Sequence, residues 1–232
     1  MLPKKGDRLS TWLPTKTEMV TRDVKQYNAD YQMSIERRTF ADVQSTLSSV
    51  KPGMSRGHSP VTRGNATDDA SCGHAEWNGN RLTFTGEGRR NYWFIPAVEN
   101  GVSFAVLVPD TLAIGGYVVS DNYGGCEYHV AVNSSTMELA LLHVFRGSSG
   151  LTKYSLGSGW VMKDTLRSND LVAKIPYKVD NPGQRDGSVL SISYIPPCRN
   201  WKDFTIESDF ICVKSGIVTH ALQSDIRDSV IG

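Results

Sequence analysis

Residues 120–146 read SDNYGGCEYHVAVNSSTMELALLHVFR, and this stretch decides the fold. Two runs with apolar side chains, residues 126–133 and 136–144, flank the polar pair Ser134-Ser135. The shortest solution is a hairpin of two strands joined by a two-residue loop. That register places Asn133 opposite Thr136 and Cys126 opposite His143.

The two faces of the predicted hairpin differ in character, because side chains alternate along a strand and opposed residues share a face. One face is mostly apolar and ends in a thiol and an imidazole: Cys126, Tyr128, Val130, Val132, Met137, Leu139, Leu141 and His143. The other is mostly polar: Glu127, His129, Ala131, Asn133, Thr136, Glu138, Ala140 and Leu142. A slip of one residue would mix the two sets, so the pattern itself favours this register.

A cysteine beside a histidine at the rim of a core face supplies what thiol catalysis needs. The imidazole of His143 would take the proton of the Cys126 thiol, and the thiolate is the nucleophile. Gly124-Gly125 lets the chain bend sharply and approach a substrate closely. Backbone N–H groups at Gly125 and Cys126 are candidates for holding an oxyanion. The structural alternative is a buried thiol beside a hydrogen-bonded histidine.

Composition excludes several functional classes. At 232 residues the chain is long enough for one domain, or for one domain with an appendage. Its net charge of +1 argues against binding of nucleic acid through phosphate contacts. No apolar run approaches the ~20 residues of a membrane span, and the N-terminus lacks the apolar stretch of a cleavable signal peptide. The four cysteines form no C-x-x-C pair, so neither a zinc knuckle nor a disulfide scaffold is indicated. No P-loop, Gly-x-Gly-x-x-Gly or Asp-rich metal loop occurs, and we expect no metal and no cofactor.

The first 70 residues form a separate segment in this interpretation. Capping-box spacings at Thr15 and Thr39 precede two stripes of apolar residues with helical periodicity. Residues 51–71 are rich in Gly, Ser, Pro and Asn, which predicts a linker. We therefore expect an N-terminal helical segment and linker over residues 1–70 and a β-rich catalytic domain over residues 71–232. The stripes are typical of core packing, and docking of a secretion chaperone is the alternative.

Short strands separated by turn signals dominate the rest of the chain. Besides the hairpin, the predicted strands cover residues 81–86, 91–98, 102–108, 111–120, 160–166, 171–179, 188–195 and 204–213. A short closing helix is predicted from residue 217. The fold class that fits is α+β, with a β-sandwich or curled mixed sheet and flanking N-terminal helices.

Two other motifs point to different chemistry. Residues 72–76, CGHAE, contain the His-x-Glu of zinc deaminases, but Pro197-Cys198 lacks the second cysteine that those enzymes need. Residues 143–147, HVFRG, are similar to the Arg-Gly strand of ADP-ribosyltransferases, with Ser191, Ser193 and Glu207 as later elements. The Glu-x-Glu of that family is absent, and this toxin class stays an alternative.

The segment from Ser120 to His143 resembles the active-site segment of the Cys–His glutamine deamidases. These include the catalytic domain of cytotoxic necrotizing factor, Burkholderia lethal factor and the bacterial chemotaxis receptor deamidase. Gly125-Cys126 and His143 match their pattern, and a hydroxyl residue that assists in some members falls at Ser120, six residues before the cysteine. The Leu-Ser-Gly-Cys of the toxins is replaced here by residues 123–126, YGGC. The resemblance implies an α+β fold and a protein-glutamine deamidase.

On this hypothesis Cys126 attacks the carboxamide, His143 moves the proton and Ser120 orients the imidazole. The partner is a protein substrate with a glutamine side chain. The expected location is the cytosol of a host or target cell, reached by a secreted effector without a cleavable signal peptide, with a cytoplasmic enzyme as the alternative. Other functions left open are a transglutaminase, a cysteine protease, and a non-enzymatic β-sandwich that binds or assembles.

Overall fold

The computed structural model describes residues 2, 4–7, 57–64, 66–67, 71–78, 81–85, 91–120, 123–147, 150–173, 188–214 and 217–223. Within them the chain folds into two large sheets and one small one. The predicted α+β class with a sandwich-like arrangement of strands is confirmed. Among these residues no helix is long and apolar enough to cross a membrane. The two predicted N-terminal helices lie outside the described residues.

The five-stranded sheet contains the predicted hairpin at its centre. Its strand order is β11-β8-β9-β6-β2, and all neighbours are antiparallel except the parallel pair β2–β6. The strands are β2 (Ala66–Thr67), β6 (Val102–Leu107), β8 (Glu127–Asn133), β9 (Glu138–Val144) and β11 (Val161–Arg167). β8 and β9 are central strands of this sheet, and the side chains on both of their faces are buried.

The seven-stranded sheet has the order β14-β13-β12-β7-β5-β3-β4, with β5 and β7 parallel and the other pairs antiparallel. Its strands are β3 (Ser71–Asn78), β4 (Arg81–Thr85), β5 (Tyr92–Ile95), β7 (Gly116–Ser120), β12 (Ser188–Ile195), β13 (Glu207–Lys214) and β14 (Ile217–Gln223). In the described part of the chain, three short helical turns connect strands: α5 (Pro109–Leu112), α6 (Ser168–Val172) and η2 (Trp201–Asp203).

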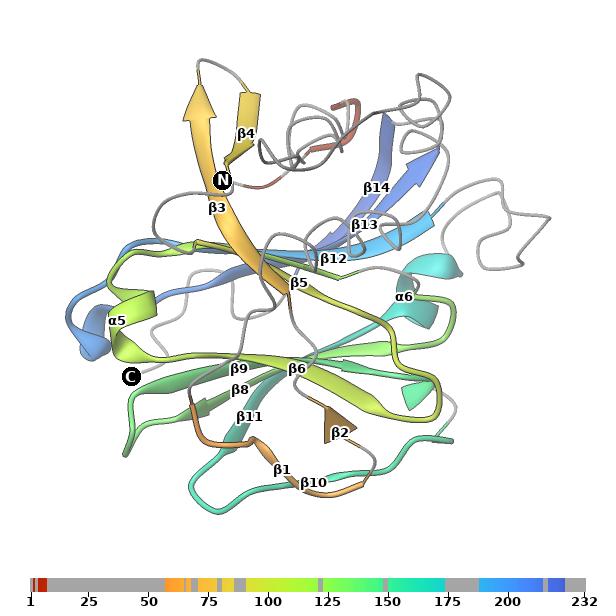
Figure 1. Ribbon diagram of the computed structural model, residues 1–232. Coiled ribbons are helices and arrows are strands. Elements are labelled where there is room, and N and C mark those ends of the chain that lie inside the picture. The colour runs from red at the N-terminus through yellow and green to blue at the C-terminus, as the bar shows by residue number, and fades with distance from the viewer. Residues whose placement is uncertain are drawn as a thin grey trace, which may run out of the picture.

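The two large sheets stack face to face, and a third layer covers the outer side of the five-stranded sheet (Figure 1). The main core lies between the large sheets and takes Tyr128 and Leu141 from the hairpin and Val118 and Phe210 from the opposite sheet. The third layer is the pair β1 (Val61–Arg63) and β10 (Ser155–Leu156). It helps to enclose a second apolar cluster, which explains why the predicted polar face of the hairpin is buried.

The hairpin register differs from the predicted one by two residues. Asn133 pairs with Glu138 and Tyr128 with His143, so residues 134–137 form a four-residue loop. The predicted opposition of Cys126 and His143 is therefore wrong. An even shift leaves every strand residue on its predicted face, so Cys126 and His143 still share the main core side, as diagonal neighbours.

The side chain of Asn133 explains the wider loop. Its Oδ1 accepts hydrogen bonds from the backbone N–H groups of Ser135 and Thr136, at 3.2 and 3.4 Å, and from the Ser135 hydroxyl at 2.6 Å. Met137 then closes the loop with a left-handed φ of 55°, and it is 44% exposed rather than in the predicted core. Asparagine side chains commonly organise turns in this way. These hydrogen bonds favour the four-residue loop over the predicted two-residue loop.

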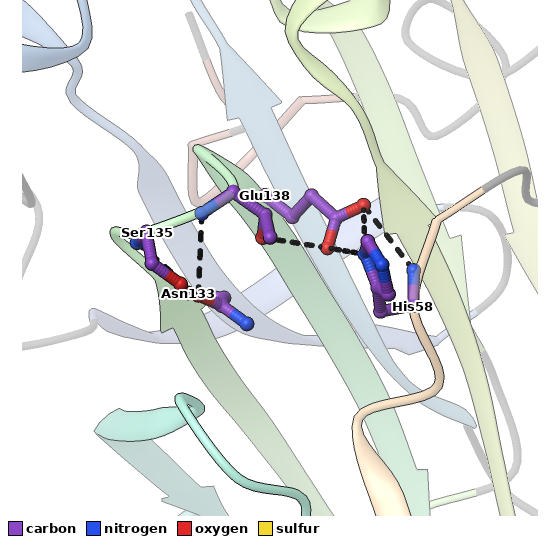
Figure 2. A network of polar contacts seen from close by, with 5 residues as sticks. His58, Asn133, Ser135 and Glu138 are labelled. Carbon is purple, nitrogen blue, oxygen red and sulfur yellow. Dashed lines mark hydrogen bonds and ion pairs between the residues drawn. The ribbon is translucent and has the colours of Figure 1, made fainter.

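Glu138 fixes the same end of the hairpin to the segment that precedes β1. Its buried carboxylate lies 3.0 Å from Nδ1 of His58, and it accepts hydrogen bonds from the His58 backbone N–H and the Thr136 hydroxyl. Figure 2 shows the carboxylate reaching across to His58 while Asn133 and Ser135 close the loop. Residue 58 and strands β1 and β2 fall in the predicted linker, so that prediction is wrong for residues 61–63 and 66–67.

Three further predictions of secondary structure are wrong. The strand predicted from residue 111 begins only at Gly116, because Pro109 starts the helical turn α5. Leu171 and Val172, predicted as a strand start, lie in α6. The predicted closing helix from residue 217 is the strand β14, which pairs with β13 along its length.

Candidate functional site

His143 is held at the end of β9 by Ser120, the last residue of β7 in the opposite sheet. Its Nδ1 lies 2.8 Å from Oγ of Ser120, and that hydroxyl donates a 2.6 Å hydrogen bond to the carbonyl of Ile95. Because a carbonyl can only accept, the hydroxyl proton is committed to Ile95, and Nδ1 of His143 must be the protonated nitrogen. The structure thus brings together Ser120 and His143, as predicted, and assigns the tautomer.

The second ring nitrogen of His143 is left with a lone pair. Nε2 is buried and has no hydrogen-bond partner among the described residues. Burial, with a smaller contribution from the nearby charge of His129, lowers the pKa of His143 from 6.5 to about 3. Desolvation of the imidazolium is the main cause, so the ring is neutral at physiological pH. A neutral imidazole with one unused basic nitrogen can accept a proton.

Tyr123 covers the face of the His143 ring. The two rings are stacked, with centroids 4.2 Å apart and planes 19° from parallel. The tyrosine hydroxyl accepts a 3.0 Å hydrogen bond from Ser191 of β12. Burial raises the pKa of Tyr123 well above its usual value, and hydrogen bonds with Ser120 and Ser191 offset part of that rise. The phenol is therefore neutral.

Cys126 immediately precedes β8 and is only 2% exposed. Its Sγ accepts a 3.3 Å hydrogen bond from the backbone N–H of Arg146. Arg146 follows β9 and adopts a left-handed φ of 47°, which is unfavourable for a residue with a side chain. An amide donor directed at sulfur can stabilise negative charge that develops there during a reaction. Because the hairpin pairs Tyr128 with His143, Cys126 lies diagonally beside His143 on the same face.

Gly125 has the backbone conformation that the glycine pair suggested. Its φ is 114°, which favours glycine, and the segment turns there into β8. Its N–H, a predicted oxyanion donor, is directed at the Ser168 hydroxyl at 2.9 Å. The amide of Arg146 is the donor found near the sulfur instead. This contact depends on a turn after β9 that no local sequence signal marks.

We name Ser120, Tyr123, Cys126 and His143 the His143 cluster. All four side chains are buried, and the adjoining surface is at the glycines, since Gly124 is exposed and Gly125 half-buried. A pocket of about 90 Å³ lies elsewhere. It is lined by Pro109, Leu112, Met137, Cys198, Arg199, Trp201 and Phe204, at the α5 end of the sandwich, whereas Cys126 lies at the α6 end (Figure 1). The pocket therefore does not serve the cluster.

Two residues that sequence reasoning did not assign to the site are Tyr123 and Ser191. Ser191 was considered only as part of an ADP-ribosyltransferase motif, together with Ser193. Both serines point into the core, where Ser191 bonds Tyr123 and Ser193 bonds Tyr128 at 2.7 Å. The one sequence signal is that β12 places serines at alternate positions among buried residues, which marks a polar stripe on its core face.

No known protein family, curated protein or solved structure matches this chain. The geometry and protonation of the His143 cluster are therefore the basis for assigning a function.

Proposed function

We propose that the chain is a thiol-dependent amidohydrolase that deamidates glutamine side chains of a protein substrate. The observation that carries the proposal is the unpartnered Nε2 of His143, in a ring whose Nδ1 proton is committed to Ser120. Cys126, on the same face, accepts an amide N–H at its sulfur. A neutral base with a defined tautomer and a cysteine on the same face are the two groups that Cys–His catalysis needs, and Sγ must move within hydrogen-bond distance of Nε2, to which it is not bonded in this structure.

In the proposed mechanism both groups are neutral at rest, because burial disfavours the imidazolium. His143 Nε2 takes the thiol proton as Sγ of Cys126 attacks the carboxamide carbon, giving a tetrahedral oxyanion. The N–H groups of Arg146 and Cys126 are the nearest candidates to bind that oxyanion. His143 then passes the proton to the departing nitrogen, and ammonia leaves a thioester.

Water completes the reaction. His143 removes a proton from a water molecule as the water oxygen bonds to the thioester carbon. The carbon–sulfur bond then breaks, and the departing thiolate of Cys126 takes that proton back from His143. The product is glutamate. An amine in place of water would give transglutamination by the same steps. The substrate is a protein in the cytosol of a host or target cell, and the chain reaches it as a secreted effector.

The burial of Cys126 and His143 requires the site to open before a carboxamide can reach the sulfur. The segment that must move is short, since exposed Gly124 is two residues from Cys126. Glycines at such a position allow the backbone to change conformation at low cost. Enzymes often gate access to the reacting groups with loops of this kind.

The test is to incubate the protein with a blocked glutaminyl dipeptide and with a panel of host-cell proteins. Ammonia release and replacement of NH₂ by OH at glutamine, read by peptide mass spectrometry, are expected for the native chain. Cys126→Ser should abolish both. Cys212→Ser is the matched control, because Cys212 is an equally buried cysteine of the same core. Equal activity in the native chain and Cys126→Ser would contradict the proposal.

The second candidate is a non-enzymatic β-sandwich that binds or assembles. The observation that favours it is the exposure of Cys126, which at 2% is typical of a core thiol. It predicts no turnover, and self-association that Cys126→Ser leaves unchanged. Size-exclusion chromatography with light scattering, run on the same two variants, separates this function from the enzyme.

A further inference from the structure

We infer that Tyr123, anchored by Ser191, is a positioning residue that fixes the plane of the His143 imidazole and so the direction of its unpartnered Nε2. The inference rests on the proposed function in that it names a device that serves the same base. Its physical part, the orientation of the ring, can be tested without any substrate.

The His143 ring is held at two different places. Ser120 holds one edge, at Nδ1, and this single contact leaves the ring able to rotate about the hydrogen bond. Tyr123 lies against the ring face with centroids 4.2 Å apart, and this contact prevents that rotation. Both side chains are fully buried, so no water competes for either contact. One edge and one face together define the plane of the imidazole.

Tyr123 is itself fixed from the opposite sheet. Its hydroxyl accepts the hydrogen bond from Ser191, its backbone N–H donates to the carbonyl of Val189, and its ring packs edge-on against Phe210. All three partners belong to β12 or β13. The plane of His143 therefore depends on the seven-stranded sheet, although His143 belongs to the five-stranded one.

The chain offers a matched control in Tyr128. Its hydroxyl lies 2.7 Å from Oγ of Ser193, it is fully buried, and it bridges the same two sheets. It is also the residue opposite His143 in the hairpin. The aromatic stacking contact of His143, however, is with Tyr123. Loss of the Tyr128 hydroxyl removes its bond with Ser193, whereas loss of the Tyr123 hydroxyl removes its bonds with Ser191 and Ser120. Of the two tyrosines, Tyr123 is the one whose ring stacks on the histidine.

The experiment compares two double variants, Tyr123→Phe/Ser191→Ala and Tyr128→Phe/Ser193→Ala. Each replaces a bonded pair by apolar groups, so neither member of the pair is left without the other. Each also removes one further bond, that of Ser193 with Ser208 or that of Tyr123 with Ser120, so the two variants stay comparable. Two-bond ¹H–¹⁵N correlation spectra report the tautomer and mobility of His143. The native chain should show one neutral Nδ1–H tautomer. The Tyr123 variant should show exchange broadening or a second tautomer, and the Tyr128 variant should keep the native spectrum.

Turnover supplies the second measurement. Release of the ring should lower kcat of the Tyr123 variant about tenfold with KM unchanged, because misorientation of a catalytic group acts on the chemical step. The Tyr128 variant should keep the native kcat. Identical His143 spectra in both variants would overturn the inference. If the native chain turns over no glutamine substrate, the proposed function fails, and the spectra still decide whether Tyr123 positions the ring.

Discussion

The β8–β9 hairpin holds two buried histidines on its opposite faces, and their surroundings differ. His129 uses both ring nitrogens: Nε2 lies 2.8 Å from the carboxylate of Glu127, and Nδ1 lies 2.5 Å from the hydroxyl of Tyr154. His143 uses only Nδ1, and its Nε2 has no partner within the described residues. A buried polar atom without a hydrogen-bond partner costs about 1–3 kcal/mol. Nε2 of His143 therefore destabilises the folded state, whereas the paired nitrogens of His129 stabilise it.

The difference separates a structural imidazole from a chemically available one. The hydrogen bond from His129 lowers the pKa of Glu127, which is therefore an ionised acceptor. Nε2 of His129 must then carry a proton, and Nδ1 forms its hydrogen bond with the Tyr154 hydroxyl. Every polar atom of that trio has a fixed role, and the trio joins the residue before β10 to the sheet. At His143 one ring nitrogen, Nε2, is left for a substrate, and substitution of each histidine in turn tests this difference.

The largest expected effect is on turnover. His143→Leu should lower kcat on a glutamine substrate by about a thousandfold or more, because general acid–base catalysis contributes up to that order. His129→Leu should keep kcat within about threefold of the native value, since His129 faces the other side of the sheet. Steady-state kinetics of ammonia release at one temperature give both numbers. Equal losses in the two variants would remove the distinction.

The same two substitutions should affect stability in the reverse order. His129→Leu leaves the Tyr154 hydroxyl without its acceptor and Glu127 with only the exposed Arg167, at 3.2 Å, so unfolding should cost about 2–4 kcal/mol less. His143→Leu removes an atom that had no partner, and Ser120 keeps its bond to Ile95, so the change should stay within about 1 kcal/mol. Urea unfolding monitored by tryptophan fluorescence measures both changes. A greater loss in His143→Leu would show that its ring is structural.

Acid should lower the stability of the protein, because His143 stays neutral in the folded state and is protonated in the unfolded state. In the unfolded chain its pKa returns to about 6.5, whereas the native pKa is about 3, so the unfolded state binds a proton first as the pH falls. Stability should therefore decline from about pH 6.5 downward, with a slope approaching 1.4 kcal/mol per pH unit. Glu127 has a lowered pKa, so its contribution is lost only at lower pH.

The informative window is therefore between about pH 5 and pH 6.5. Urea titrations across it should give a steeper decline for the native chain than for His143→Leu. His129→Leu keeps His143, so its curve should have the native slope and be displaced to lower stability. Parallel curves for the native chain and His143→Leu would contradict the depressed pKa.

The smallest expected effect comes from Tyr154→Phe. It removes the hydroxyl that is hydrogen-bonded to His129 and keeps the ring packed in the second apolar cluster, so we expect a loss of about 1 kcal/mol. Turnover should stay unchanged, in contrast to Tyr123→Phe, which alters the residue stacked on His143. Denaturation midpoints and kcat for the two variants give the comparison. A loss of turnover in Tyr154→Phe would connect the two faces of the hairpin.

Alternation of apolar and polar residues predicted which side chains of the hairpin face the main core, and it did so despite a wrong register. The period of a strand is two, so a shift by two residues leaves the faces intact. The same shift moves Cys126 from opposite His143 to a diagonal position. The cause was the side chain of Asn133, which builds a wider loop and holds Met137 in a left-handed conformation. Periodicity carries no information about such a turn.

The contacts that complete the candidate site could not be predicted from local patterns. Ser120 was found as a hydroxyl at a fixed distance before Cys126, and it does bond His143. Tyr123 meets Ser191 only because β12 packs across from the hairpin, and β14 is a strand only because β13 offers it a paired edge. Both outcomes depend on the packing of distant segments, which overrides local propensity.

The hydrogen bond between Tyr123 and Ser191 joins residues 68 positions apart. A ribosome therefore completes the whole β8–β9 hairpin, with its cysteine and both histidines, well before it makes the serine. Domains form as units during synthesis, and long-range pairings come late. Because β12 lies inside the seven-stranded sheet, between β7 and β13, that sheet cannot assemble without it. A nascent chain would therefore hold the nucleophile and the base for some time as ordinary side chains, and the cell that makes the protein would meet the assembled site only after β12 has been made.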